Sequence, residues 1–164
     1  MSGIEAPRAL APADRLDSFS CGEPTLDRWL KERARRNETE GATRCLVICS
    51  DGAVVGYYAL AAGAVSHVDA PGRVRRNMPE PVPVVVLARL AIDSNWQGRD
   101  LGRALLRDSV RRVVAAADIV GVRAILVHAL TERAKPFYER FGFSVSPVHP
   151  LTLMITLADA RRAL

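Results

Sequence analysis

Hydrophobic and polar positions in the first third of the chain predict one helix followed by a pair of strands. Apolar side chains recur every three or four residues over 24–37, and a proline is tolerated in the first turn, so a helix is expected there. Apolar runs over 43–49 and 53–65 are typical of strands. Ser50-Asp51-Gly52 lies between them and predicts a hairpin turn.

The rest of the chain alternates between strand and helix patterns. In order, the patterns predict a mostly buried strand over 84–92, a helix over 101–117, a strand over 122–130, a short helix over 131–141, and strands over 143–145 and 151–157. The segment 69–83 holds four prolines and is expected to be a loop with room for one helical turn, and residues 1–17 are expected to be irregular. This order indicates a mixed α/β sheet with helices on its faces, parallel where a helix crosses over.

Length and composition narrow the class of protein. The 164 residues, 49% of them apolar, can form one core, so we expect a single domain over 1–164. No run of 18 or more apolar residues occurs, and the first ten residues lack the charged-then-apolar order of a signal peptide. These features favour a cytoplasmic protein without a membrane segment. Because Cys21, Cys45 and Cys49 form no C-x-x-C pair, neither a disulfide framework nor a metal site is expected.

The positive charge is concentrated in three places. The net charge is +5, and 21 of the 23 basic residues are arginine. Arginines recur at every fourth position from Arg99 to Arg111, and further basic residues gather over 28–36 and 73–76. Such clusters favour a polyanionic partner, and the alternative is three solvated faces of an arginine-rich protein.

The stretch Q-G-R-D-L-G-R-A-L-L-R-D, residues 97–108, lies between the expected strand ending at Ile92 and the following helix. Anions bind at such positions, because free amide groups and the helix dipole point toward them. Asp100 complicates this interpretation, since its carboxylate could instead accept those amides as an ordinary helix cap. Both interpretations stay open on the residues alone.

Two motifs, in order along the chain, resemble the GNAT (Gcn5-related N-acetyltransferase) superfamily. L-A-R-L-A-I-D-S-N-W-Q-G-R-D-L-G-R-A-L-L resembles its acetyl-CoA loop, and A-K-P-F-Y-E-R-F-G-F resembles its later helix and strand. Within that superfamily, F-S-C-G-E-P-T-L-D-R-W-L and G-Y-Y-A-L resemble the toxins of type II toxin–antitoxin modules, which acetylate the amino group of aminoacylated tRNA. The similarity runs from about Phe19 to Leu157.

The resemblance implies a GNAT fold of the α/β (α+β) class, with a mixed, mostly antiparallel central sheet and helices on both faces. It implies acetyl-CoA as cosubstrate, with no metal. The residues expected to hold acetyl-CoA are Leu90, Ala91 and Ile92 at the strand end, followed by Gln97, Gly98, Arg99, Asp100, Leu101, Gly102 and Arg103. Asp100 departs from the family, which usually has glycine there, and it puts the tightness of binding in doubt.

Tyr138 is the expected catalytic residue, because the corresponding tyrosine of the family protonates the departing CoA thiolate. A phenol with a pKa near 10 is protonated at pH 7 and can donate to sulfur. The alternative is a tyrosine that only packs beside Phe137 and Phe143. Neither Asp93 nor His128 is a convincing general base. An α-amino group has a pKa near 8, so part of it is already the neutral nucleophile.

An aminoacyl-tRNA substrate would account for the basic clusters, because phosphate contacts bring affinity without reading sequence. The candidate tRNA contacts are Arg33, Arg35, Arg36, Arg73, Arg75, Arg76 and Arg89. A buried ion pair is the alternative for Arg89. The resemblance also implies a homodimer and a cognate antitoxin, often of the ribbon-helix-helix type.

We therefore expect a toxin that transfers acetyl from acetyl-CoA to the α-amino group of aminoacyl-tRNA and so blocks translation. One alternative is a GNAT enzyme that acetylates a small amine or a protein N-terminus. Another is a non-enzymatic module that binds nucleic acid or a partner protein and has lost its cofactor through Asp100.

Overall fold

The computed structural model describes residues 3–164. Its strands are β1 (Arg8–Ala9), β2 (Arg44–Ser50), β3 (Ala53–Val65), β4 (Val82–Ile92), β5 (Ala124–His128), β6 (Ser144–Val145) and β7 (Thr152–Thr156). Its α-helices are α1 (Pro24–Glu32), α2 (Ala34–Thr39), α3 (Gly72–Arg75), α4 (Leu101–Ala116), α5 (Lys135–Phe141) and α6 (Leu157–Ala163). Three short 3₁₀ turns complete the described part: η1 (His67–Asp69), η2 (Ser94–Trp96) and η3 (Glu132–Ala134).

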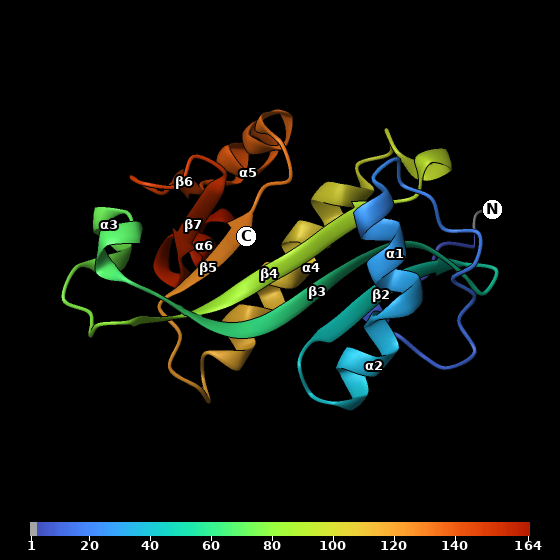
Figure 1. The fold of residues 1–164 in the computed structure, drawn as a ribbon, viewed down its shortest axis with the longest axis horizontal. Helices are drawn as coiled ribbons and strands as arrows, with labels where there is room; N and C mark the ends of the chain where they lie inside the picture. Colours follow the sequence, from blue (N-terminus) through green and yellow to red (C-terminus); the bar gives the residue numbers. More distant parts are fainter. Residues whose placement is uncertain (1–2) are drawn as a thin grey trace. The chain divides into compact units, whose positions relative to one another are not determined.

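The strands form a mixed sheet in the order β1-β2-β3-β4-β5-β7-β6 (Figure 1). Strands β4 and β5, joined through α4, are parallel, whereas the pairs β1–β2, β2–β3, β5–β7 and β6–β7 are antiparallel. The expected mixed, mostly antiparallel sheet with a parallel crossover is confirmed.

Internal contacts divide the chain into two compact units. The first takes the residues up to Ala61 together with Ala88–Ser109, and the second takes Ala62–Leu87 together with Val110–Leu164. Strands β3 and β4 and helix α4 each run from one unit into the other. The single domain expected over 1–164 stays a prediction.

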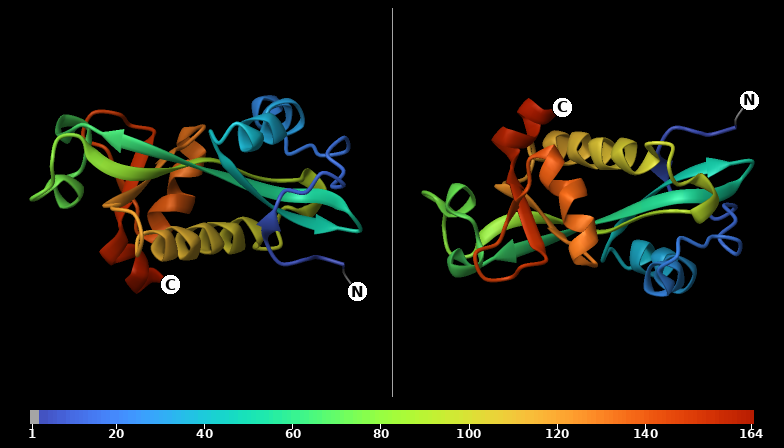
Figure 2. Two further views of the ribbon diagram at one scale, coloured as in Figure 1. Left: turned by 90° about the horizontal axis from the view of Figure 1, so that it is seen from below. Right: turned by 90° about the horizontal axis from the view of Figure 1, so that it is seen from above.

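In the first unit, helices cover both faces of the β2–β3 hairpin. Tyr57 and Tyr58 are neighbours on β3, so their side chains point to opposite faces. The Tyr57 hydroxyl donates to the carbonyl of Leu26 on α1 at 2.7 Å, and the Tyr58 hydroxyl donates to Asp108 on α4 at 2.6 Å. The two views of Figure 2 show α1 and α2 on one side of this hairpin and the first turns of α4 on the other.

The core of the first unit forms where α1 and α2 pack on the sheet. Phe19, Leu30 and Tyr57 are fully buried there, together with Cys45 and Val47. Gly56 is required on β3, because a Cβ at this position would lie 2.8 Å from the Ile92 side chain and 2.9 Å from the Ile48 side chain. The end of β4, where the resemblance places the cosubstrate, is therefore held against the hairpin by close packing.

The second unit has a core of its own between α3 and the strands β4, β5 and β7. Val74, Val82, Ala124 and Met154 are among its buried residues. Arg123 fixes α3 in place, since its guanidinium donates to the carbonyls of Val74 at 3.0 Å and of Arg73 at 2.7 Å.

Three expected elements differ in the structure. The helix expected over 24–37 is interrupted at Arg33, whose φ of −122° is not helical, so α1 and α2 are separate. Residues 1–17 are not wholly irregular, because Arg8 and Ala9 pair with β2. The strand expected over 151–157 ends at Thr156, whose hydroxyl accepts the amide of Asp159 and caps α6, a helix that was not predicted.

Candidate active site

The turn after β4 is ordered by the buried carboxylate of Asp93. One of its oxygens accepts the amide of Asn95 at 2.9 Å and the other accepts the amide of Ser20 at 3.0 Å. Asp93 therefore caps η2 and attaches the segment before α1 to the end of β4. Because both oxygens already accept backbone amides, Asp93 is a poor candidate for a general base.

Gln97 has a structural task that sequence reasoning missed. Its side-chain amide donates to the carbonyl of Ile92 at 2.8 Å and to the carbonyl of Cys21 at 3.0 Å. The side chain thus holds the loop closed on the protein itself. No local pattern in the sequence indicates this, because Cys21 is 76 residues away along the chain.

The loop reaches α4 through two residues with left-handed backbone. Gly98 has a φ of +81° and Asp100 has a φ of +61°. Glycine adopts this region freely, whereas aspartate adopts it at some cost, so a glycine at position 100 would fit the geometry better. The first helical hydrogen bond runs from the amide of Ala104 to the carbonyl of Asp100 at 3.1 Å.

The amides at the entrance to α4 are free to receive an anion. Within residues 3–164, the amides of Leu101, Gly102 and Arg103 find no acceptor, and the Asp100 carboxylate takes none of them. This geometry argues against the interpretation of Asp100 as an ordinary side-chain cap. An array of unsatisfied amides at the start of a 16-residue helix favours a phosphate group.

Two arginines bring positive charge to this entrance. The guanidinium of Arg99 lies 4.5 Å from the ring centroid of Trp96 and donates to the carbonyl of Asn95 at 3.3 Å. The side chain of Arg103 is exposed and has no partner in the described part of the chain. Both charges can offset the carboxylate of Asp100 in the presence of a diphosphate.

The last residues of β4 lie outside its parallel ladder. The pairing of β4 with β5 runs from Val84–Ala124 to Leu87–Val127 and does not include Leu90, Ala91 or Ile92. Backbone groups at the end of a strand that are not used by that ladder are suited to an extended ligand. These three residues and the Gln97–Arg103 loop belong to the same compact unit.

Tyr138 lies on α5 in the second unit, among aromatic rings. Its ring makes edge contacts with Phe137 at 5.0 Å and Phe143 at 5.7 Å between centroids, and the residue is 7% exposed. Burial raises the pKa of Tyr138 to about 12. Its hydroxyl has no partner in residues 3–164, and the only fully buried unpartnered side-chain polar atom there is Thr43 Oγ1. The hydroxyl is therefore free to donate a hydrogen bond to a ligand.

His128, the other residue weighed as a base, ends β5 with an exposed side chain. Its Nδ1 lies 2.9 Å from the hydroxyl of Thr152, the residue opposite it on β7. This pairing gives the side chain a structural partner.

The arginines expected to contact tRNA differ in what they already bind. Arg35 donates to the carbonyls of Ala11, Pro12 and Asp14, and Arg36 pairs with Glu40 at 3.8 Å. Arg73 forms two bonds to Asp159, at 2.9 and 2.6 Å, and Arg75 donates to the carbonyl of His67 at 3.3 Å. The side chains of Arg33, Arg76 and Arg89 have no ion pair or hydrogen bond to a described residue.

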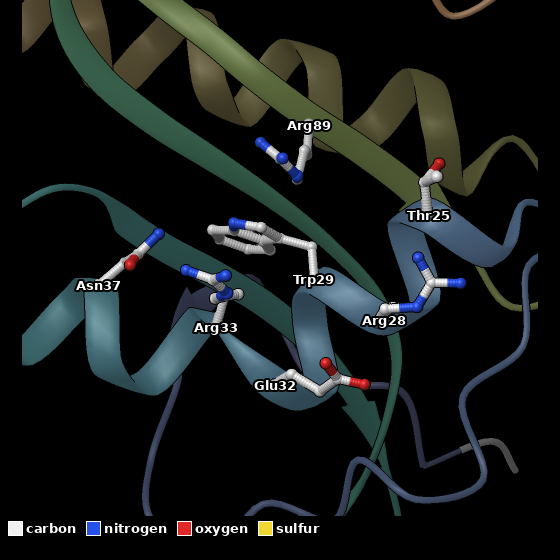
Figure 3. Close-up of a pocket in the computed structure, with 7 residues that line it drawn as sticks. All are labelled: Thr25, Arg28, Trp29, Glu32, Arg33, Asn37 and Arg89. Atoms are coloured by element: carbon white, nitrogen blue, oxygen red, sulfur yellow. The ribbon is translucent and has the colours of Figure 1, made fainter.

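Arg33 and Arg89 meet at a pocket in the first unit. Figure 3 shows the guanidinium of Arg89 above the Trp29 ring and that of Arg33 beside it. The distance from the Arg89 guanidinium carbon to the Trp29 ring centroid is 4.7 Å. The pocket is also lined by Thr25, Arg28, Glu32 and Asn37. Within the described residues no buried ion pair involves Arg89, so that alternative is not supported.

Comparison with known proteins agrees with this geometry. A family model for the acetyltransferase (GNAT) domain matches residues 41–145, a span that includes β4, the Gln97–Arg103 loop and Tyr138. The chain belongs to the GNAT family. The resemblance inferred from the two sequence motifs is confirmed, and the protein is an acetyltransferase by family.

Relatives of this GNAT protein cover nearly all of its length. It is 58% identical over 161 residues to a tRNA-acetylating toxin of Mycobacterium tuberculosis (strain ATCC 25618 / H37Rv), covering 98% of this chain and 97% of the relative. A solved structure of AtaT complexed with acetyl-methionyl-tRNAfMet is 26% identical, with a TM-score of 0.89 and coverage of 97% and 98%. A mutant of the AtaT toxin bound to the C-terminus of the antitoxin AtaR and acetyl-CoA is also 26% identical, with a TM-score of 0.84 and coverage of 98% and 97%.

Two further observations apply to the described residues. They contain no group of three or more His, Cys, Asp or Glu side chains that could hold a metal ion. None of their helices combines the length and the apolar character needed to cross a membrane.

Proposed function

We propose that this protein transfers the acetyl group of acetyl-CoA to the α-amino group of aminoacyl-tRNA and thereby blocks translation. The observation that carries the proposal is the 58% identity, over 98% of the chain, to a relative that is named for tRNA acetylation. The free amides at the entrance to α4 supply a physical basis for binding acetyl-CoA. The unpartnered arginines supply one for binding tRNA.

The residues at the end of β4 and the start of α4 fit acetyl-CoA. The amides of Leu101, Gly102 and Arg103 would receive its diphosphate, and the backbone of Leu90, Ala91 and Ile92 would receive its extended arm. When bound, acetyl-CoA supplies the acetyl group as a thioester that an amine can displace. The role of the Gln97 side chain is to keep the loop in shape.

The proposed nucleophile explains why the chain can work without a strong base. An α-amino group has a pKa of about 7.7 to 8.0, so roughly a tenth or more of it is neutral at pH 7, whereas a lysine side chain is almost wholly charged. The proton lost by the nitrogen as the amide bond forms can pass to water. Asp93, with both oxygens engaged, is not needed for this step.

Tyr138 is proposed to stabilise the departing sulfur. Its free hydroxyl is protonated at neutral pH, since its pKa is raised to about 12 by burial. A thiol has a pKa of about 8.5, so a phenol of this pKa is the weaker acid. The phenol therefore donates a hydrogen bond to the developing thiolate more readily than it gives up its proton completely.

We further propose that the protein is cytoplasmic, because charged tRNA is found there, and that it is a homodimer with a cognate antitoxin. AtaT, which shares this fold, has been solved with the C-terminus of its antitoxin AtaR. The ribbon-helix-helix type of antitoxin remains part of the proposal.

The proposed reaction is tested by incubating the protein with labelled acetyl-CoA and total charged tRNA. Label should appear on tRNA and disappear after mild deacylation, because the acetyl group is attached to the esterified amino acid. Label on polyamines or protein N-termini but not on tRNA would contradict the tRNA proposal and favour another acetyltransferase. No transfer and no binding of acetyl-CoA at millimolar concentration would contradict the enzymatic proposal altogether.

A further inference from the structure

The pocket beside α1 and α2 concentrates positive charge in a concave site. It has a volume of about 410 Å³ and is lined by Arg28, Arg33 and Arg89 but by only one carboxylate, that of Glu32. Pockets of a few hundred Å³ are large enough for a ligand of nucleotide size. Because the lining holds three arginines and one carboxylate, the pocket favours an anionic ligand.

Arg89 is held in place by a stack of buried rings. Tyr57, whose hydroxyl donates to Leu26, stacks on Trp29 with centroids 5.8 Å apart and an angle of 12° between the ring planes. The guanidinium of Arg89 also lies over the Trp29 ring, 4.7 Å from its centroid. The indole thus contacts both a tyrosine ring and a cation, and the cation–π contact positions the guanidinium without neutralising it.

Neither Arg89 nor Arg33 has an anionic partner among the described residues. Arg35 and Arg73 differ, because their guanidinium groups already bind carbonyls and a carboxylate, respectively. Arg89 is also half-buried, and a partly desolvated cation gains more from an incoming anion than one in open solvent. Figure 3 shows the side-chain amide of Asn37 turned toward the same space, where it offers a further donor.

We propose that this pocket holds one phosphodiester group of the RNA substrate, with Arg33 and Arg89 both donating to its oxygens and Trp29 acting as a positioning residue for Arg89. The inference deepens the proposed function and rests on it for the identity of the RNA. A planar guanidinium donates two parallel hydrogen bonds to a phosphate, and two such groups can donate to the oxygens of one phosphate together.

Binding of uncharged tRNA, measured over a range of salt concentrations, tests the pocket without requiring acetyl transfer. Arg33→Ala and Arg89→Ala should each raise the Kd about tenfold at low salt, because each removes a charge-assisted contact. In the double variant the magnitude of the slope of log K against log[salt] should decrease by roughly 0.7 to 0.9, the value for one phosphate. Each single variant should lose less of this slope, because the remaining arginine still contacts the same phosphate.

The matched control is Arg161→Ala, which removes the same charge from an exposed position on α6. Its Kd and salt slope should stay close to those of the unmodified protein. Arg89→Lys keeps the charge but lacks the planar guanidinium, so its Kd should lie between those of the unmodified protein and Arg89→Ala. If Arg33→Ala and Arg89→Ala bind tRNA like Arg161→Ala, the pocket does not hold a phosphate of the RNA.

Tryptophan emission gives a second readout. The chain has two tryptophans, so in a Trp96→Phe background Trp29 is the only one that emits. Uncharged tRNA should change this emission, since the occupant binds the guanidinium that lies on the indole, and Arg89→Ala should abolish the change. Inorganic phosphate, compared with chloride at equal ionic strength, should give a weaker change at millimolar concentration.

The two proposals fail in different ways. If tRNA is acetylated but neither tRNA nor phosphate alters Trp29 emission, and the KM for charged tRNA is unchanged in Arg89→Ala, the pocket proposal is wrong and the proposed function stands. If tRNA alters the emission through Arg89 but is never acetylated, the pocket proposal stands and the proposed substrate is wrong.

Discussion

At the entrance to α4 the groups offered to a ligand are backbone amides in an exposed turn, whereas on α5 the group offered is a single phenol among buried aromatic rings. The first site is shaped by left-handed residues at 98 and 100, and three amides are available together. The second depends on one oxygen atom whose pKa is set by burial. Backbone amides remain in place as donors when a side chain differs, as it does at Asp100. The phenol is a single donor, and a substitution that removes its hydroxyl leaves no other group in its place.

The sharpest test of this contrast is Tyr138→Phe, with the largest expected effect. Removal of the hydroxyl should lower kcat for acetyl transfer at least tenfold, an increase of about 1.4 kcal/mol or more in the barrier, while acetyl-CoA affinity stays unchanged. Single-turnover kinetics and calorimetry measure the two quantities. Tyr58→Phe is the matched control, because it removes a buried hydroxyl bonded to Asp108 and should lower stability without slowing transfer. Equal turnover in Tyr138→Phe would remove Tyr138 from the mechanism.

On the backbone side, Gly98→Ala tests whether the turn before α4 depends on the left-handed conformation of residue 98. No atom lies within 4 Å of a Cβ built on Gly98, so the substitution meets no steric obstacle, only a φ of +81°. Alanine pays roughly 1–2 kcal/mol for this region. We expect the free energy of unfolding to fall by about 1 kcal/mol in chemical denaturation. Gly72→Ala, at a position with the same open space but without a positive φ, is the control and should not show this loss.

The sequence predicted some parts of the structure better than others. Local pattern was enough for the β2–β3 hairpin, because Asp51 and Gly52 are turn residues and both have a positive φ in the structure. It was enough for α4 as well, which begins at Leu101 as expected. The motif around Tyr138 placed it on a short helix correctly, but its burial and its free hydroxyl follow from tertiary packing.

What the sequence did not reveal depends on partners that are distant along the chain. Gln97 bonds a carbonyl 76 residues away, and Arg89 lies on Trp29, 60 positions earlier. Arg73 and Arg33 belong to basic clusters that look alike in sequence, yet Arg73 is paired with Asp159 and Arg33 is unpaired. Charge spacing predicts where cations lie, and only the fold decides which of them remain available for a ligand.

A change at position 100 separates charge from backbone at the entrance to α4. Asp100→Gly removes a carboxylate near the expected diphosphate and also relieves a φ of +61°, so acetyl-CoA affinity should rise up to about fivefold, or roughly 1 kcal/mol. Asp100→Asn removes only the charge, because asparagine tolerates this backbone nearly as well as aspartate. Calorimetry on both variants shows how much of the gain in acetyl-CoA affinity comes from removing the charge and how much from the change in backbone. A loss of affinity in both would show that the carboxylate helps to bind the cosubstrate.

The smallest expected effect concerns the pKa of Tyr138. Burial raises this pKa from about 10 in the unfolded chain to about 12 in the fold, so the unfolded state loses its proton first as the pH rises. The stability that the neutral phenol provides is therefore complete below pH 10 and decreases between pH 10 and pH 12. At pH 10.5 the loss should be below about 1 kcal/mol. Denaturation of the unmodified protein and of Tyr138→Phe at pH 8 and pH 10.5 isolates the loss of stability due to Tyr138, because the other tyrosines are common to both proteins. If the difference in stability between the two proteins does not change with pH, the phenol is not buried as the structure has it.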